Sequence, residues 1–157
     1  MGRMTHTAWS LTPTQNGACA RFMPIHPPLK LHNHKKWKVL MKILIVDDNK
    51  KVRDMIRQIL AGTAATFLEC NNGIEALALH NAESPDCILM DIEMQPVDGI
   101  TTTEMIKRSG THAKVIVVTQ YDTEDFREKA RTAGADGFLS KEYLTDLPGL
   151  IRKVIGG

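Results

Sequence analysis

From Met41 onward, the sequence predicts an α/β fold, a (βα)5 three-layer sandwich in which one parallel sheet lies between two layers of helices. Two observations lead to this prediction. Short apolar runs rich in β-branched residues alternate with amphipathic stretches, a pattern typical of successive βα units. The first and third runs, residues 42–46 and 87–90, are almost entirely apolar, as expected of neighbouring central strands that are buried on both faces.

The alternation places five strands and five helices along the chain. The strands are expected at Lys42–Val46, Ala65–Glu69, Cys87–Met90, Lys114–Thr119 and Gly137–Leu139. The helices are expected, roughly, at Asn49–Ala61, Gly73–Asn81, Asp98–Arg108, Thr123–Ala133 and Leu144–Ile155.

Turn and capping residues support these limits. The Asn-Asn-Gly sequence at 71–73 makes a turn and a cap before the second helix, and Ser84 with Pro85 ends that helix and opens the third strand. Gly134 follows the fourth helix, where a C-terminal cap belongs.

The first 40 residues differ from the rest of the chain. They contain six Lys or Arg but no Asp or Glu, together with both tryptophans and four of the seven prolines, and they show no sustained periodicity. We therefore predict that residues 1–40 are a disordered or artefactual N-terminal extension and that residues 41–157 form the domain. Because Met41 directly precedes the first strand, it is a candidate for the authentic start of translation.

The composition limits the classes of partner. A chain of 157 residues suits one globular domain, and no apolar run approaches the length of a membrane span, so no membrane partner is expected. Residues 41–157 carry 14 basic and 18 acidic side chains, which argues against direct nucleic-acid binding and is compatible with a divalent cation. Because Cys19, Cys70 and Cys87 lack CxxC spacing, neither a disulfide framework nor a zinc site is expected, and a reducing cytoplasm fits best.

Acidic side chains follow two of the predicted strands. Asp47 and Asp48 end the first strand, and Asp91 ends the third. In a flavodoxin-like sheet of order 2-1-3-4-5, ligands bind outside the carboxyl ends of the strands, between strands one and three. Three carboxylates gathered there repel one another, so a bound divalent cation is the natural compensation. Mg²⁺ suits oxygen ligands and phosphate chemistry, and Mn²⁺ could substitute for it.

Two more polar groups are predicted at this rim. Thr119 ends the fourth strand and Lys141 follows the fifth. A single carboxylate after a strand is usually a cap or a solvated loop residue, but five such groups at four strand ends favour a functional site. Such a set can perform phosphoryl transfer to a carboxylate, in which an aspartate oxygen forms an acyl phosphate. The cation, the ammonium group and the hydroxyl would then bind the phosphoryl oxygens.

Four motifs carry a resemblance to a known family. The chain resembles the receiver domains of bacterial two-component response regulators, in particular the stand-alone chemotaxis regulators, from residue 41 to about 155. The motifs are VDDN at 46–49, DIEMQPVDG at 91–99, VVT at 117–119 and GADGFLSK at 134–141.

The resemblance implies a role for each site residue. Asp91 would be the phosphoacceptor, Thr119 the switch hydroxyl and Lys141 the lysine that contacts the phosphoryl group. The ligands of Mg²⁺ would be Asp47, Asp48, Asp91 and the backbone carbonyl of Glu93. The domain would be a signalling receiver rather than a metabolic enzyme, catalysing only its own phosphorylation and dephosphorylation.

A switch residue and a binding face are also implied. Phe138, three residues before Lys141, corresponds to the aromatic that moves inward with the switch threonine, although an ordinary strand aromatic is an equal alternative. The added charge would shift the fourth helix, fifth strand and fifth helix, a face that would bind a target protein or support a phosphorylation-dependent homodimer. Some basic residues on these helices could dock a partner, although a solvated face explains them more often: Arg127, Lys129, Arg131 and Lys153.

The sequence departs from the family pattern at the loops around Asp91. Gln95 stands where proline is common, and Pro96 comes one residue late without a change in spacing. Gln120 replaces a small residue. Glu93 and Tyr121 flank the expected path of attacking water, so we expect an altered phosphate lifetime, of undetermined sign.

The partner implied by the family is a histidine kinase or a phosphotransfer protein that supplies the phosphoryl group. The first hypothesis is a stand-alone receiver that signals by protein contact. The second is the N-terminal receiver of a truncated DNA-binding transcription regulator, because the final IRKVIGG resembles the junction before a helix-turn-helix output domain. A third, a Mg²⁺-dependent phosphatase, is disfavoured because no cap domain fits.

Overall fold

The computed structural model describes residues 40–156, so the predicted extension lies outside the described residues except for Leu40. The strands are β1 (Met41–Val46), β2 (Ala65–Cys70), β3 (Cys87–Met90), β4 (Lys114–Thr119) and β5 (Gly137–Ser140). The helices are α1 (Lys50–Leu60), α2 (Gly73–Glu83), α3 (Gly99–Arg108), α4 (Glu124–Thr132), the 3₁₀ helix η1 (Lys141–Asp146) and α5 (Leu147–Ile155).

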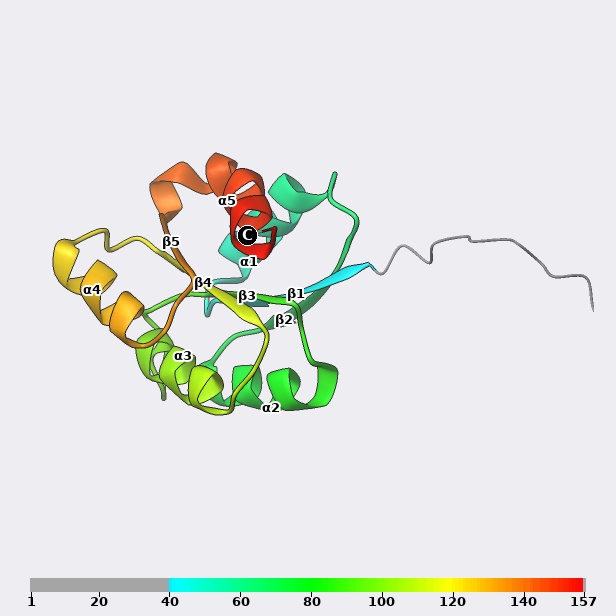
Figure 1. Cartoon of the computed structure of the whole chain (residues 1–157). Coiled ribbons are helices and arrows are strands. Elements are labelled where there is room, and N and C mark those ends of the chain that lie inside the picture. The colour runs from blue at the N-terminus through cyan, green and yellow to red at the C-terminus, as the bar shows by residue number, and fades with distance from the viewer. Residues whose placement is uncertain (1–39, 157) are drawn as a thin grey trace, which may run out of the picture. The chain divides into compact units, whose positions relative to one another are not determined.

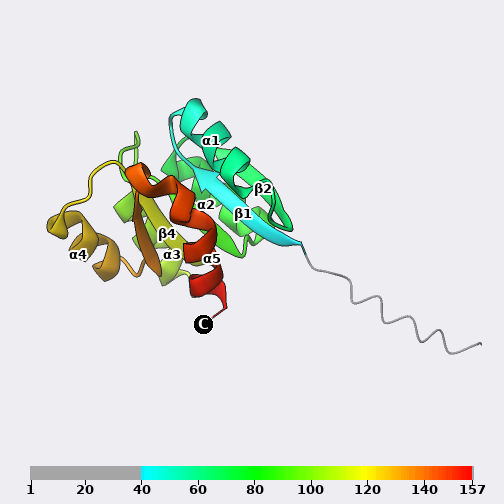
Figure 2. The same ribbon diagram turned by 90° about the horizontal axis from the view of Figure 1, so that it is seen from above.

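The five strands form one parallel sheet in the order β2-β1-β3-β4-β5, which confirms the predicted topology. Helices α1 and α5 cover one face, and α2, α3 and α4 cover the other (Figure 1). Figure 2 looks onto the face covered by α1 and α5. The carboxyl ends of the central strands are in register, because Val46 pairs with Met90 and Met90 with Val117. Residues that follow these strands are therefore brought to the same edge.

The central strand β1 contributes to the core on both faces of the sheet. Ile43 and Ile45 pack with α1 and α5, whereas Leu44 and Val46 pack with α2 and α3. All four are 0–1% exposed, because successive side chains of a strand point to opposite faces. Burying each of them contributes roughly 1.5–3 kcal/mol to stability. The site residues that follow β1 therefore stand on a strand whose last four residues are buried.

Side chains cap the helices that begin near the site edge. Asn49 accepts a hydrogen bond from the Lys51 N–H at the start of α1, and Asn72 caps α2 as predicted. Asp98 caps α3 and Thr123 caps α4 in the same way. Each cap satisfies backbone N–H groups that the first turn of a helix leaves unpaired.

The predicted fifth helix begins at the wrong residue. Leu144 lies in η1, which contains a kink at Tyr143 (φ −113°, ψ 31°), and the α-helix begins only at Leu147. The reason is Pro148, which has no N–H and is tolerated only in the first turn of an α-helix. Residues 141–146 therefore connect the fifth strand to α5 as a separate turn of 3₁₀ helix.

Gly134 adopts φ +90° directly after the cap of α4, as the sequence predicts, and Ser84 ends α2 in the left-handed region with φ +47°. Within residues 40–156, no helix is both long and apolar enough to cross a membrane.

Candidate functional site

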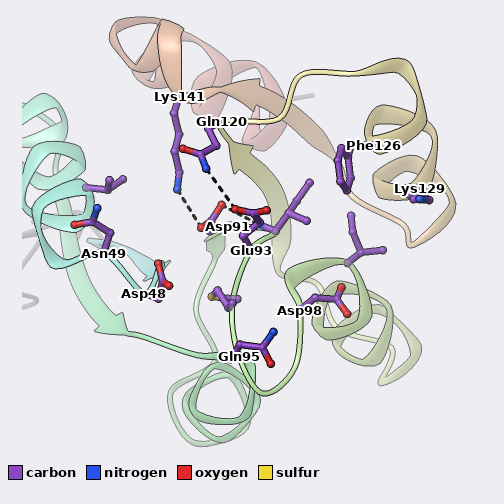
Figure 3. A pocket seen from close by; sticks show the side chains of 14 residues that line it. Asp48, Asn49, Asp91, Glu93, Gln95, Asp98, Gln120, Phe126, Lys129 and Lys141 are labelled. Atoms are coloured by element: carbon purple, nitrogen blue, oxygen red, sulfur yellow. Dashed lines mark hydrogen bonds and ion pairs between the residues drawn. The ribbon is translucent and has the colours of Figure 1, made fainter.

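The polar residues predicted to meet at the sheet edge do so. Asp47 and Asp48 follow β1, Asp91 follows β3, Thr119 ends β4 and Lys141 begins η1 directly after β5. Asp48, Asp91 and Lys141 line a cavity of about 780 Å³ above this edge. Figure 3 shows these three side chains directed toward the same space.

The three aspartates form a cluster suited to a divalent cation. One carboxylate oxygen from each of Asp47, Asp48 and Asp91 lies within 4.8 Å of the others. Asp47 and Asp91 are buried, whereas Asp48 is exposed. Mg²⁺ prefers such carboxylate oxygens and retains several water ligands, which the open cavity beside Asp48 can accommodate. The residues present therefore fit a Mg²⁺ ion.

Lys141 joins two of these acids. Its Nζ lies 2.7 Å from Asp47 Oδ2 and 3.0 Å from Asp91 Oδ2, and its side chain is 16% exposed. The second oxygen of Asp47 accepts a hydrogen bond of 2.8 Å from the Asn49 N–H. The lysine charge therefore offsets part of the carboxylate repulsion in this arrangement.

The environment changes the pKa values of Asp91 and Lys141. Burial raises the pKa of Asp91 to about 6; Asp47 adds to this rise, whereas Lys141 and the Ile92 N–H oppose it. Burial alone would lower the pKa of Lys141, but the two carboxylates outweigh it and raise the pKa. Both groups are thus charged near neutral pH, and Asp91 holds its charge at an energetic cost.

Thr119 is fully buried, and its hydroxyl oxygen accepts a hydrogen bond from the Tyr121 N–H at 3.2 Å. Phe138 lies on the neighbouring strand β5, opposite Val117 and two positions before the partner of Thr119. It packs with Val117 and the α4 residue Ala130 rather than in the cavity. The structure thus brings Thr119 to the site and places Phe138 under α4.

Arg127 covers the ring of Phe138. Its guanidinium carbon lies 4.7 Å from the ring centroid, and two of its nitrogens bond to Asp122 at 2.6 and 2.7 Å. The other basic residues expected on α4 are also paired, Lys129 with Asp125 and Arg131 with Glu128. On α4, therefore, the basic side chains interact within the domain.

A hydrogen bond connects the loop after β3, which carries Asp91, to the loop after β4. Gln120 Nε2 donates to Glu93 Oε2 at 3.3 Å, and Figure 3 shows this pair beside Asp91. The Gln95–Pro96 peptide bond in the same loop is cis. The larger residue at position 120 thus contacts the loop that carries Glu93.

Two residues near the site were not singled out from the sequence. Gly99 begins α3 so close to Asp91 that a Cβ would overlap the Asp91 carbonyl. Arg53 donates a hydrogen bond of 2.8 Å to the Asp47 carbonyl. The sequence offered a signal for Gly99, because a glycine directly follows the capping residue Asp98. It offered none for Arg53, whose spacing from Asp47 does not indicate a contact.

The comparisons agree with this geometry. The model of the response regulator receiver domain matches residues 43–152. Chemotaxis protein CheY of Halobacterium salinarum is 36% identical over 102 residues, which are 65% of this chain and 85% of that protein. Response regulator MprA of Mycobacterium leprae is 31% identical over 73% of this chain, but the match spans only 51% of MprA.

Among solved structures, a DNA-binding response regulator of the LuxR family from Staphylococcus aureus is similar, with a TM-score of 0.70 and 27% identity. The likeness covers 74% of this chain and 99% of that one. The region matched by the family model includes the aspartate cluster. The chain belongs to the response regulator receiver domain family and is a signalling receiver domain.

Proposed function

We propose that Asp91 accepts a phosphoryl group from a phosphohistidine of a histidine kinase or phosphotransfer protein, beside a Mg²⁺ ion. The observation that carries this proposal is the placement of Asp91. Its buried carboxylate lies in the acidic cluster, 3.0 Å from Lys141, and lines the cavity. The ligands of the ion would be Asp47, Asp48, Asp91 and the backbone carbonyl of Glu93.

Burial and access to the cavity favour Asp91 over its neighbours as the nucleophile. Asp47 is buried too, but it is not among the residues that line the cavity. Asp48 is exposed, which suits a metal ligand more than a nucleophile shielded from water. Asp91 combines burial with access to the cavity.

In the proposed reaction, an Asp91 oxygen attacks phosphorus in line, and an O–P bond forms as the P–N bond of the donor breaks. The donor imidazole nitrogen keeps the electron pair of that bond. Lys141, released from Asp47, pairs with one phosphoryl oxygen, and the Thr119 hydroxyl donates to another. A bound Mg²⁺ would neutralise charge on the phosphoryl oxygens.

The output follows from the movement of Thr119 toward the phosphoryl group. Phe138 lies on β5 two residues before Ser140, the strand partner of Thr119. Its ring would then move away from the position in which Arg127 stacks on it. Such a change alters α4 and β5, and we propose that the face formed by α4, β5 and α5 binds a target protein or a second copy.

The hydrogen bond between Gln120 and Glu93 supports a proposal about phosphate lifetime. Both side chains line the cavity mouth next to Asp91, where a phosphodonor or an attacking water must pass. We propose that this pair, with Tyr121, sets how fast the phosphoryl group enters and leaves. We also propose a cytoplasmic location, which fits the free thiols of Cys70 and Cys87, and a receiver that extends over residues 41–157.

The direct test is incubation of the protein with acetyl phosphate or a phosphohistidine donor and Mg²⁺. Intact-mass spectrometry should show one added phosphoryl group that is lost on treatment with hydroxylamine, as expected of an acyl phosphate. The Asp91→Asn variant should show none. A wild-type protein that stays unmodified, or an adduct that persists in the variant, would refute the assignment of Asp91.

A second candidate is the receiver of a longer DNA-binding regulator. It is favoured by the match to MprA, of which the similar region spans 51%, and by the likeness to a DNA-binding regulator of the LuxR family. Sequencing the coding region beyond Gly157 distinguishes the candidates, because an open frame that encodes a helix-turn-helix segment would establish the longer protein.

A further inference from the structure

An ion-pair cluster behind the acidic site connects α1 and β2 to the backbone of Asp47. Arg53 on α1 is 14% exposed, and its Nε lies 3.1 Å from Glu69 Oε2 on β2. Its Nη1 donates a hydrogen bond of 2.8 Å to the Asp47 carbonyl oxygen. Arg57, one turn further along α1, also pairs with Glu69, at 2.8 Å. The two arginines share one acidic partner, but the carbonyl contact is made by Arg53.

This contact acts on the peptide unit that connects two of the site acids. The Asp47 N–H donates to the Cys70 carbonyl of β2 at 3.3 Å, while Arg53 holds the Asp47 carbonyl on the other side. The peptide plane between Asp47 and Asp48 is therefore restrained by Arg53 of α1, while the contact with β2 restrains the preceding plane, between Val46 and Asp47. The orientation of the plane between Asp47 and Asp48 sets the position of the Asp48 Cα atom. It therefore affects where the exposed Asp48 carboxylate lies relative to Asp91.

We propose that Arg53 is a positioning residue for the metal site: by holding the Asp47 carbonyl, it keeps the Asp48 carboxylate within coordinating distance of Asp91. The inference rests on the proposed Mg²⁺ site. Arg53 does not touch the ion or the phosphoryl group. Its planar guanidinium suits the task, because separate N–H groups reach Glu69 and the carbonyl at the same time, which a lysine cannot match.

Arg53 could influence the site through its positive charge as well as through its hydrogen bond to the Asp47 carbonyl. A substitution of Arg57 distinguishes these two effects. Substituting either arginine by methionine removes one positive charge from the cluster around Glu69 and one ion pair. Only Arg53→Met also removes the hydrogen bond to the Asp47 carbonyl. Arg57→Met is therefore a control for the loss of one charge and one ion pair at Glu69, made at the more exposed of the two arginines, 54% against 14% exposed.

The experiment measures Mg²⁺ affinity of the full, unphosphorylated chain by isothermal titration calorimetry, together with the amide shifts of Asp48 and Asn49 in ¹⁵N NMR. Arg53→Met should weaken binding about tenfold or more, the range found for partners that orient metal ligands. It should also shift both amides before Mg²⁺ is added. Arg57→Met should change the Kd less than about twofold, since exposed charges are strongly screened.

The outcomes distinguish a failure of the positioning role of Arg53 from a failure of the proposed Mg²⁺ site. Equal losses of affinity in the two variants, or an unchanged Kd in Arg53→Met, would overturn the positioning role. If Arg53→Met does not fold, Arg53→Lys and Arg57→Lys replace the pair, and weaker binding confined to Arg53→Lys is the supporting result. Wild-type protein that does not bind Mg²⁺ overturns the metal site itself.

Discussion

Replacing Asp91 by asparagine should stabilise the unphosphorylated domain at neutral pH in the absence of Mg²⁺. Asp91 is 4% exposed, and burial is the main cause that raises the pKa of its carboxyl group from 3.8 to about 6. This rise corresponds to roughly 3 kcal/mol by which the ionised form destabilises the fold. Asparagine has the same shape without the charge, and it should recover most of this free energy.

The pH dependence provides the sharper test. Because the folded-state pKa is above the unfolded one, the destabilisation by Asp91 is fully present above about pH 6 and disappears as the pH falls toward 3.8. The difference in unfolding free energy between variant and wild type should therefore be about 3 kcal/mol at pH 7.5, or roughly 10 °C in Tm, and should approach zero near pH 4.

Urea unfolding of both proteins in EDTA between pH 4.5 and 7.5 measures this difference, in which titrating groups remote from Asp91 cancel. A variant that is no more stable than wild type at pH 7.5 would refute the reasoning. So would a difference that does not change with pH, because it would show that the gain arises from packing rather than from the buried charge of Asp91.

Three further predictions concern the same edge of the sheet. Gln120→Ala removes the hydrogen bond to Glu93 and should speed phosphorylation by acetyl phosphate about two- to tenfold, because one such bond changes an activation free energy by an amount that corresponds to this factor. An unchanged rate would show that this pair does not control access to Asp91. Gly99→Ala places a Cβ against the Asp91 carbonyl and should cost roughly 2–4 kcal/mol in urea unfolding, whereas Gly62→Ala, with open space around it, should cost almost nothing. Mg²⁺ at 100 times its Kd should stabilise the wild type by about 2.7 kcal/mol, and chelation by EDTA should abolish both this gain and the phosphorylation.

Much of the site could be predicted because its residues follow buried strands. Once β1 and β3 are recognised as neighbours, Asp47 and Asp91 must lie at the same edge, whatever the loops do. The start of α5 was missed because the amphipathic pattern continues through residues 141–146, and the local effect of Pro148 decides where the α-helix begins.

The side-chain contacts between loops could not be predicted in the same way. Gln120 and Glu93 are 27 residues apart, and Arg53 reaches a backbone carbonyl rather than a side chain. Such pairs depend on the approach of separate loops and on rotamers, which hydrophobic periodicity does not describe. The ligand role of the Glu93 carbonyl and the switch role of Phe138 remain predictions.

The stacking of Arg127 on Phe138 stabilises the observed arrangement of these two side chains only weakly. A cation–π contact at a partly exposed site contributes about 0.5–1 kcal/mol, which favours the stacked arrangement only about two- to fivefold. If nothing else distinguished the two arrangements, the unphosphorylated protein would already occupy the alternative one for a sizeable fraction of the time. Phosphorylation would then adjust a pre-existing equilibrium, and loss of the Arg127 side chain would raise the basal signal without abolishing the response.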